Sequence, residues 1–370
     1  MALKVGIVGL PNVGKSTLFN SLTKKQVPAE NYPFCTIDPN VGVVAVRDAR
    51  IDKLAEISHS LKKIFATVEF VDIAGIVKGA SEGEGMGNKF LSNIMECDAI
   101  VQVVRTFVNP DILHVHDKID PKNDIEVINL ELILKDLEIL DKHIFRIGKE
   151  SRVNKALVPV SEFLNLLKTH LEAGKLAREF FDENIAKYSQ DETFNSEIKQ
   201  IQLLTNKPFV FVANVDEESV NKYSETDLRS LLNIPEKYEV LPLCIKLEYE
   251  LSSLSAEDLQ LFLEEYKLEE VGLDRLIKKC YHLLGLVSYF TTGEDETRAW
   301  TIHKGDNAKT ASGVIHSDIM DNFIAAEVVA YDDFVNLGGY KGCKDAGKLR
   351  IESKEYIVQD GDVVEFRHNG

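Results

Sequence analysis

The sequence has no apolar run that could cross a membrane and few cysteines or prolines. Its longest apolar stretches, such as residues 209–213 and 283–287, are far shorter than the roughly 18 residues that a membrane-spanning helix needs. The five cysteines are scattered without a CxxC pair, and there are only 10 prolines. The residues after Met1 lack the charged, apolar and small-residue regions of a secretory signal. We therefore expect a cytoplasmic globular protein with reduced thiols and no membrane contact.

Basic residues are also scarce relative to acidic ones. The chain has 60 aspartates and glutamates against 43 lysines and arginines, and its formal net charge is −17. This charge excludes a protein that coats nucleic acid with its whole surface, although it permits a local basic face. The length of 370 residues exceeds what one compact core usually holds. We therefore expect two or three domains.

The first twenty residues contain a nucleotide-binding pattern. The apolar residues 3–8 precede the run GLPNVGKST at 9–17, and a helical pattern follows at 18–23. This order matches the GxxxxGK[ST] loop, in which backbone N–H groups and a helix N-terminus hold phosphates. Lys15 is expected to bridge the β and γ phosphates, and the Ser16 hydroxyl is expected to ligate Mg²⁺.

Two further motifs follow in the order that a GTPase-like domain needs. Thr36 lies in a turn-rich segment, about where a switch I threonine closes over Mg²⁺. The apolar strand at 67–71 leads into Asp-Ile-Ala-Gly at 72–75, a DxxG motif. Asp72 is expected to hold a Mg²⁺-bound water, and the Gly75 amide to contact the γ-phosphate.

The position after the DxxG motif carries Ile76, where many GTPases place a glutamine that orients the attacking water. An aliphatic side chain cannot hold a water, so hydrolysis should be slow or should depend on another group, a cation or a partner. Asn12 either seats a monovalent cation beside the phosphates or only stabilises its loop. His114 either orients the water or is a surface histidine.

The residues that select the nucleotide base are expected directly after the apolar strand at 209–213. Guanine-specific relatives carry NKxD there, and the aspartate accepts from N1–H and the 2-amino group of guanine. This chain has Asn-Val-Asp-Glu at 214–217. Glu217 is one methylene longer than aspartate, and loss of the buried bidentate contact removes about 1–3 kcal/mol of guanine preference. The sequence thus argues against strict GTP specificity and leaves ATP open.

These motifs together resemble the Obg-like ATPase family, specifically its YchF subfamily. The resemblance extends through residues 109–114, 124–132 and 290–328 and covers nearly the whole chain. It implies a translation-factor-class P-loop ATPase that prefers ATP to GTP, hydrolyses slowly, needs Mg²⁺, is stimulated by K⁺ and associates with ribosomes. It implies an α/β fold: a G-domain-like sheet with helices on both faces, an α-helical coiled-coil insertion and a C-terminal β-grasp (TGS) domain.

The resemblance also implies roles for individual residues. Those that contact the phosphates are Asn12, Val13, Gly14, Lys15, Ser16 and Thr17. Gly75 joins them, and Lys15 is the implied catalytic cation. Ser16 and Thr36 bind Mg²⁺ directly, Asp72 binds it through water, and Asn12 matches the K⁺ position. Asn214 with Val215 lines the base, and His114 is the water-positioning candidate.

Between the DxxG motif at 72–75 and the Asn-Val-Asp-Glu segment at 214–217, apolar residues recur at spacings of four and three. They run from Ile133 to Ile147 and again from Val160 to Leu171, which predicts an antiparallel helical hairpin. Residues 141–178 carry eight lysines and arginines against four acids, a net charge of +4. This hairpin either docks on rRNA or tRNA phosphates or is a solvated coiled-coil surface of ordinary charge.

The last part of the chain predicts a small β-rich domain. Short strands are expected at 287–292, 300–302, 326–330, 349–351 and 363–366, with helix between the second and third. Residues 313–319 resemble the TGS signature, which implies an RNA or ribosome docking module. We expect a nucleotide-binding G domain over 1–132 and 203–284, the helical insertion over 133–202 and the TGS domain over 285–370, in a monomeric protein.

Two other functions stay open at this point. One is an Obg-type GTPase, against which Val215 and Glu217 argue. The other is a nucleotide-gated binding or scaffold protein with little turnover, which Ile76 allows. A metabolic P-loop kinase would need a lid and an acceptor pocket, and the sequence shows neither.

Overall fold

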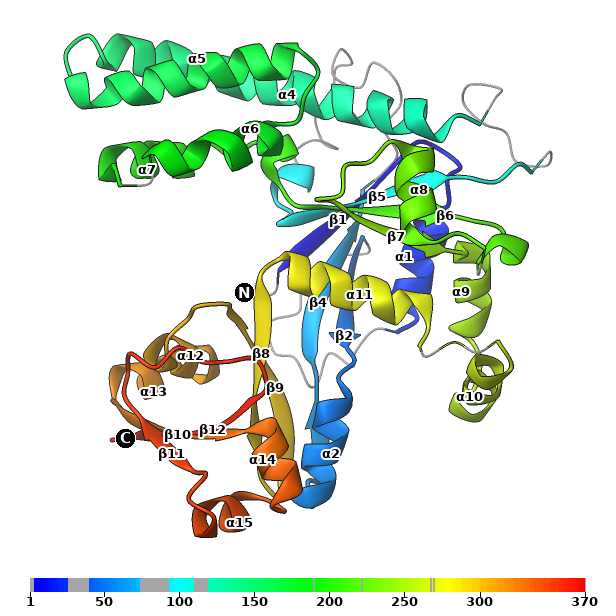
Figure 1. The fold of residues 1–370 in the computed structure, drawn as a ribbon, viewed down its shortest axis with the longest axis vertical. Helices are drawn as coiled ribbons and strands as arrows, with labels where there is room; N and C mark the ends of the chain where they lie inside the picture. Colours follow the sequence, from blue (N-terminus) through cyan, green and yellow to red (C-terminus); the bar gives the residue numbers. More distant parts are fainter. Residues whose placement is uncertain are drawn as a thin grey trace.

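The computed structural model describes residues 3–25, 40–73, 93–109, 119–188, 190–220, 222–266, 268 and 270–369. Within these ranges the strands form two six-stranded sheets, one in the order β2-β4-β1-β5-β6-β7 and the other in the order β11-β10-β12-β8-β9-β3. Figure 1 shows the first sheet between a long helical hairpin and the second sheet. No helix in the described ranges is both long and apolar enough to cross a membrane.

The first sheet is mostly parallel. It contains β1 (Lys4–Val8), β4 (Ala66–Asp72), β5 (Ala99–Arg105), β6 (Phe209–Asn214) and β7 (Glu239–Leu243), and β2 (Val41–Val46) joins its edge antiparallel to β4. Every residue of β5 and β6 is buried, as expected for parallel strands that helices cover on both faces. The carboxyl ends of β1, β5, β6 and β7 meet at one sheet edge, where ligands of open α/β sheets bind.

Helices α1 (Lys15–Thr23), α8 (Glu225–Leu232) and α11 (Gly272–Leu283) pack against this sheet, and α4 (Pro121–Glu150) contacts β5. Helix α9 (Ile245–Leu251) packs against α1. Helix α10 (Ala256–Glu265) follows α9 and lies at the margin of the domain (Figure 1). The fold class expected from the sequence is therefore confirmed for this domain.

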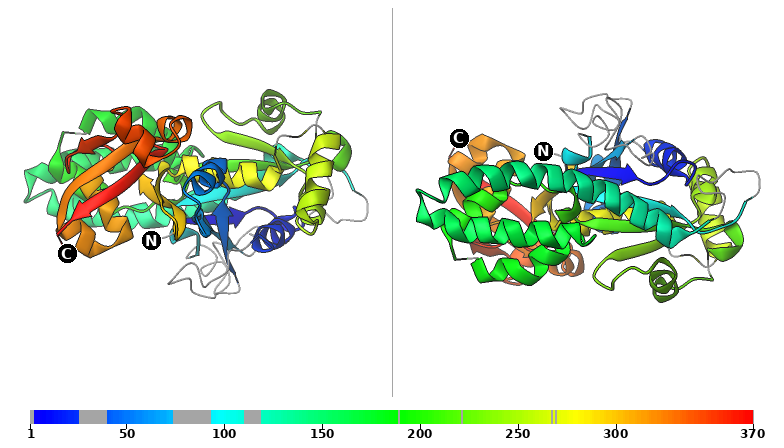
Figure 2. Two further views of the ribbon diagram at one scale, coloured as in Figure 1. Left: turned by 90° about the horizontal axis from the view of Figure 1, so that it is seen from below. Right: turned by 90° about the horizontal axis from the view of Figure 1, so that it is seen from above.

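The insertion is a helical hairpin with two further helices. It comprises α4 (Pro121–Glu150), η2 (Lys155–Leu157), α5 (Val158–Glu172), α6 (Ala177–Asn184), η3 (Ile185–Tyr188) and α7 (Glu192–Lys199). The side chains at the predicted spacing pack between α4 and α5, the two helices that Figure 2 shows side by side. The Phe163 ring contacts four aromatic rings from α6, η3 and α7 edge to face. The predicted hairpin is confirmed, and the boundary expected at 132/133 falls inside α4.

A buried carboxylate fixes the hairpin to the sheet domain. Asp136 on α4 accepts hydrogen bonds from the backbone N–H groups of Leu204 (2.6 Å) and Thr205 (2.8 Å) and from the Thr205 hydroxyl (2.6 Å). Leu204 and Thr205 belong to the turn η4 (Leu204–Asn206) that leads into β6. The root of the hairpin is therefore attached to the strand that carries the Asn-Val-Asp-Glu motif.

The C-terminal domain has its own sheet. Its strands are β8 (Leu286–Thr292), β9 (Glu296–His303), β10 (Phe323–Ala330), β11 (Arg350–Glu352) and β12 (Asp362–His368). The helices α12 (Ala308–Ile315), α13 (Ser317–Asp321), α14 (Tyr331–Asn336) and α15 (Tyr340–Asp345) connect them. β8 and β12 pair in parallel and the remaining pairs among these strands are antiparallel. All five strands expected from the sequence are present.

A joint between the two domains was not predicted. The strand β3 (Lys62–Ile64), which follows α2 (Ala49–Ile57), pairs in parallel with β9 at the edge of the C-terminal sheet. Near the start of α2, the Arg50 guanidinium bridges Asp48 (2.8 Å) and Asp360 (2.7 Å) and lies over the Phe290 ring. The C-terminal domain is therefore attached directly to the element that follows β2 in the nucleotide-binding domain.

Candidate nucleotide site

The loop between β1 and α1 has the backbone conformation that its glycines predict. Gly14 has a φ of 107°, and a Cβ there would lie 2.8 Å from Nδ2 of Asn214. A Cβ on Gly9 would lie 2.5 Å from the Val103 carbonyl oxygen. Asn12 also adopts a left-handed conformation, with a φ of 61°. The loop thus passes close to two neighbouring strands and opens the N-terminus of α1 toward a cavity, which is the arrangement that binds phosphate.

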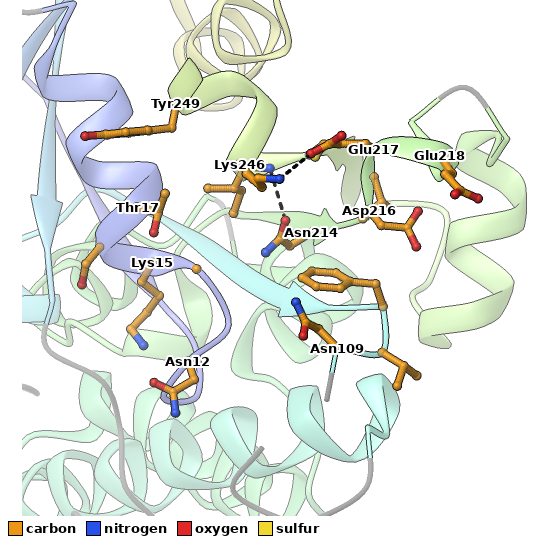
Figure 3. Close-up of a pocket in the computed structure, with 17 residues that line it drawn as sticks. Asn12, Lys15, Thr17, Asn109, Asn214, Asp216, Glu217, Glu218, Lys246 and Tyr249 are labelled. Carbon is orange, nitrogen blue, oxygen red and sulfur yellow. Dashed lines mark hydrogen bonds and ion pairs between the residues drawn. The ribbon is translucent and has the colours of Figure 1, made fainter. Parts of the chain in front are cut away.

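Lys15 is the first residue of α1 and is almost entirely buried, with 7% of its surface exposed. Its ammonium group donates to the Leu10 carbonyl at 2.7 Å. Burial lowers the pKa of Lys15 to about 8, and the nearby Asp72 carboxylate opposes this change. Figure 3 shows Lys15 between Asn12 and Thr17 along one wall of the cavity. The fold therefore keeps a cation at the phosphate end of the site at a cost in free energy.

Asp72 lies at the end of β4 beside the start of α1. The Ser16 hydroxyl bonds its carboxylate, and burial raises the pKa of Asp72 while the Lys15 charge lowers it. The other carboxylate oxygen, Oδ1, is buried and has no hydrogen-bond partner among the described residues. A hydroxyl and a carboxylate with an unused oxygen are the hard ligands that a hydrated Mg²⁺ ion prefers. The residues present therefore fit the metal that the sequence predicts.

The cavity next to this loop has a volume of about 730 Å³. Besides P-loop residues it is lined by residues 107–109 after β5, 214–218 after β6, and 244–246 with Tyr249 from the first turns of α9. All of these segments follow the carboxyl ends of neighbouring parallel strands. The space suits a nucleotide with its phosphates at α1 and its base between the later loops.

Asn214 connects three of these loops. Its Nδ2 donates to the Val13 carbonyl at 2.9 Å, and its Oδ1 accepts from the Ile245 N–H at 3.2 Å. Its backbone carbonyl accepts from both the N–H (3.0 Å) and the hydroxyl (2.9 Å) of Thr106. Asn214 therefore sets the relative positions of the phosphate loop and the base-binding loops, in addition to lining the cavity.

The segment after β5 is positioned by a buried arginine that sequence reasoning missed. Arg105 is 1% exposed, and its guanidinium donates to the carbonyls of Phe107 (3.0 Å) and Asn109 (3.1 Å). It also lies 4.9 Å from the centroid of the Phe107 ring. These contacts place Phe107 on the cavity wall. The position of residues 107–109 just after the mostly apolar strand at 99–105 was the signal that could have identified them.

An ion pair closes one side of the base end. The Lys246 ammonium lies 2.8 Å from Oε1 of Glu217, and Figure 3 shows the two side chains pointing toward each other at the cavity margin. The adjacent Glu218 pairs with Lys222 instead, at 3.8 Å. Glu217 belongs to the Asn-Val-Asp-Glu motif, whereas Lys246 comes from a segment about thirty residues later in the chain, and the sequence alone did not pair the two.

The structure brings together most of the predicted site residues. Those that line the cavity are Asn12, Gly14, Lys15, Ser16, Thr17, Asn214 and Val215. Val13 is buried under the loop and contributes its carbonyl to Asn214. Thr36, Gly75, Ile76 and His114 lie outside the described residues, so their roles remain predictions.

Comparison with known proteins gives two family matches. Residues 4–142 match a family model described as 50S ribosome-binding GTPase. Residues 286–369 match the model YchF-GTPase_C, described as protein of unknown function (DUF933).

Similar full-length proteins are also known. The chain is 51% identical to the ribosome-binding ATPase YchF of Bacillus subtilis and 45% identical to that of Escherichia coli O157:H7, with all of both chains covered in each case. It is similar to the structure of the Schizosaccharomyces pombe YchF GTPase, with a TM-score of 0.85 and 34% identity over 99% of this chain and 97% of that one. A GTP-binding protein from Pyrococcus horikoshii, at 21% identity and a TM-score of 0.60, shares the fold.

Proposed function

The chain belongs to the YchF family, and from this premise we propose that it is a slow ATP-hydrolysing switch that binds the ribosome. The cavity formed by the P-loop and the Asn-Val-Asp-Glu segment is the observation that carries the proposal. The names of the bacterial relatives include both ATPase activity and ribosome binding. The similar fission yeast protein is named a GTPase, so GTP hydrolysis is the alternative activity. A nucleotide titration distinguishes the two.

ATP preference follows from the chemistry of the base end. Val215 and Glu217 stand where guanine-specific proteins place the lysine and the aspartate of NKxD. Both residues line the cavity, and Val215 is buried against the sheet with its N–H bonded to the Leu243 carbonyl at 3.1 Å. An adenine ring needs no acceptor for N1–H or a 2-amino group, so it loses nothing by this replacement.

The phosphate end supports metal-assisted hydrolysis by a protein without a glutamine after its DxxG motif. Ser16 and Asp72 would hold Mg²⁺, with Thr36 as a further ligand, and the ion would neutralise charge on the phosphates when bound. Lys15 positions the β and γ phosphates. Asn12, at the cavity wall, is the residue that we assign to a K⁺ ion, and His114 is the residue that we assign to the attacking water.

The test of ATP preference is a titration of the purified protein with ATP and GTP in the presence of Mg²⁺. ATP is expected to bind at least about fivefold more tightly, because loss of the bidentate contact to guanine is worth roughly 1–3 kcal/mol. Phosphate release measured in KCl and in NaCl tests the cation assignment. Equal or tighter binding of GTP would contradict the ATPase proposal.

We assign ribosome binding to the helical hairpin and to the C-terminal domain, which we identify as a TGS module. In the hairpin, Arg146 already pairs with Glu150 and Glu197, and Lys168 pairs with Asp141. The basic residues left at the tip are Lys149, Arg152 and Lys155, which are exposed and form no ion pair within the described part of the chain. Val153, between them, is 91% exposed. The tip therefore concentrates the positive charge that can meet RNA phosphates.

Reversing the charge at this tip is expected to weaken ribosome binding. The variant with Lys149→Glu, Arg152→Glu and Lys155→Glu should cosediment with ribosomes about tenfold less at low salt, and the difference should shrink as salt rises. A matched pair of single variants on α4 gives the control, because Lys149 and Lys122 are both exposed and lie at opposite ends of that helix. If Lys149→Glu and Lys122→Glu lower cosedimentation equally, the tip is not the contact.

A further inference from the structure

We propose that Lys246 is a positioning residue for base selection, because its ammonium group holds the Glu217 carboxylate away from a guanine base. The inference rests on the proposed ATP preference and adds a residue to it. Lys246 is the second residue of α9, and Glu217 is the first residue of the turn η5 (Glu217–Ser219), which is separated from the end of β6 by two residues. Both side chains line the cavity, and their charged atoms are 2.8 Å apart.

The backbone around the pair fixes this arrangement. Asn214 accepts from the Ile245 N–H, and Val215 donates to the Leu243 carbonyl. These two hydrogen bonds hold the loop after β6 in register with the loop after β7. Lys246 follows β7 and Glu217 follows β6, so the two side chains start from fixed positions and point toward each other at the cavity margin (Figure 3).

The pair discriminates between bases through one oxygen acceptor. Guanine presents N1–H and a 2-amino group, and a carboxylate is the acceptor that recognises both. Accepting both donors uses both carboxylate oxygens, so guanine must compete with the Lys246 ammonium for Oε1 of Glu217. A lysine ammonium has three donors and offers guanine no acceptor in exchange. Adenine presents neither of these donors at that edge. Lys246 therefore raises the cost of binding guanine and leaves adenine unaffected.

Other cations do not duplicate this role in the described residues near the pair. Lys222 contacts Glu218, not Glu217. Lys15 and Lys24 are directed elsewhere, Lys15 to the Leu10 carbonyl and Lys24 over the Tyr249 ring at 3.5 Å. Lys246 is consequently the residue whose removal should free the Glu217 carboxylate.

The experiment compares dissociation constants for ATP and GTP in the wild type, Lys246→Met, Lys246→Arg and Glu217→Gln. Lys246→Met is expected to tighten GTP binding relative to ATP by about two- to fivefold, the range expected for a solvent-accessible ion pair. Lys246→Arg keeps the charge and should retain the wild-type ratio. In a Glu217→Gln background, Lys246→Met should leave the ratio unchanged, since no carboxylate remains to be released.

Salt provides a second readout. Because both side chains are more than half exposed, 73% for Lys246 and 53% for Glu217, high ionic strength should screen their interaction. The ATP-to-GTP preference of the wild type should fall in about 1 M choline chloride, and that of Lys246→Met should not.

Two results would overturn the inference. One is an equal change in ATP and GTP affinity on Lys246→Met, which would mean that Lys246 only shapes the cavity. The other is the same change in ratio with and without Glu217, which would mean that it does not act through that carboxylate. The wild-type ratio tests the ATP preference itself, whereas the change on substitution tests Lys246, so the two failures are distinguishable.

Discussion

Replacing Lys15 with methionine should abolish nucleotide hydrolysis without weakening the fold. Lys15 is the cation at the phosphate end of the cavity, and removal of one such preorganised charge typically costs about a hundredfold or more in rate. Phosphate release and ATP titration measure this loss. Lys122→Met, an exposed lysine at the start of α4, is the control that should keep the parental rate. Normal ATP binding and hydrolysis by Lys15→Met would contradict the assignment of the site.

The same substitution should stabilise the protein without nucleotide. Burial lowers the pKa of Lys15 to about 8 from a reference value of 10.5, so the folded state holds a charge that the unfolded state accommodates more easily. The difference corresponds to about 3 kcal/mol below pH 8, part of which the bond to Leu10 already offsets. Between about pH 8 and pH 10.5 the unfolded state binds more protons than the folded state, so wild-type stability rises with pH.

Chemical denaturation at several pH values measures this effect. Lys15→Met should be more stable than the wild type near pH 7, by roughly 1–3 kcal/mol, and the advantage should shrink toward pH 10. A variant that is less stable than the wild type at neutral pH would show that the Leu10 contact outweighs the cost of burying the charge.

Asp136→Ala should have the largest effect on folding. The carboxylate is 0% exposed and accepts hydrogen bonds from two backbone N–H groups and one hydroxyl. Alanine leaves those donors buried without an acceptor, at about 1–3 kcal/mol each, so a loss of about 3 kcal/mol or more in the free energy of unfolding is expected near pH 4. Thr205→Ser keeps the hydroxyl and all three bonds and should cost far less.

The pH dependence of that loss has a defined sign. Burial raises the pKa of Asp136 to about 6 from 3.8 despite its hydrogen bonds. The stabilisation from the protonated carboxyl is therefore fully present below about pH 4 and is lost as the pH rises through 6. The stability difference between wild type and Asp136→Ala should decrease over this window in urea denaturation. A difference that grows with pH would contradict the raised pKa.

Local patterns in the sequence determined the order of the elements and the phosphate end of the site. Residues 3–23 encode a strand, a glycine-containing loop and a helix within one short segment, and Gly14 must be glycine because of its left-handed backbone. The 4-3 spacing of apolar residues likewise predicted the hairpin, because side-chain period and helix period coincide within each helix. Contacts of this kind join residues that are close in the sequence, so their pattern can be recognised in the sequence itself.

Only the tertiary structure decided which distant segments meet at the base end and between the domains. Arg50 and Asp360 are 310 positions apart, and Lys246 and Glu217 are 29 apart on loops after different strands. The short strand β3 joins the C-terminal sheet by backbone hydrogen bonds, which carry no side-chain pattern that could be recognised in advance. Such pairings depend on the order of strands in a sheet and on how two domains pack. A buried charged residue needs a partner, and this requirement is known from the residue type alone. Strand order and domain packing determine which partner comes within reach.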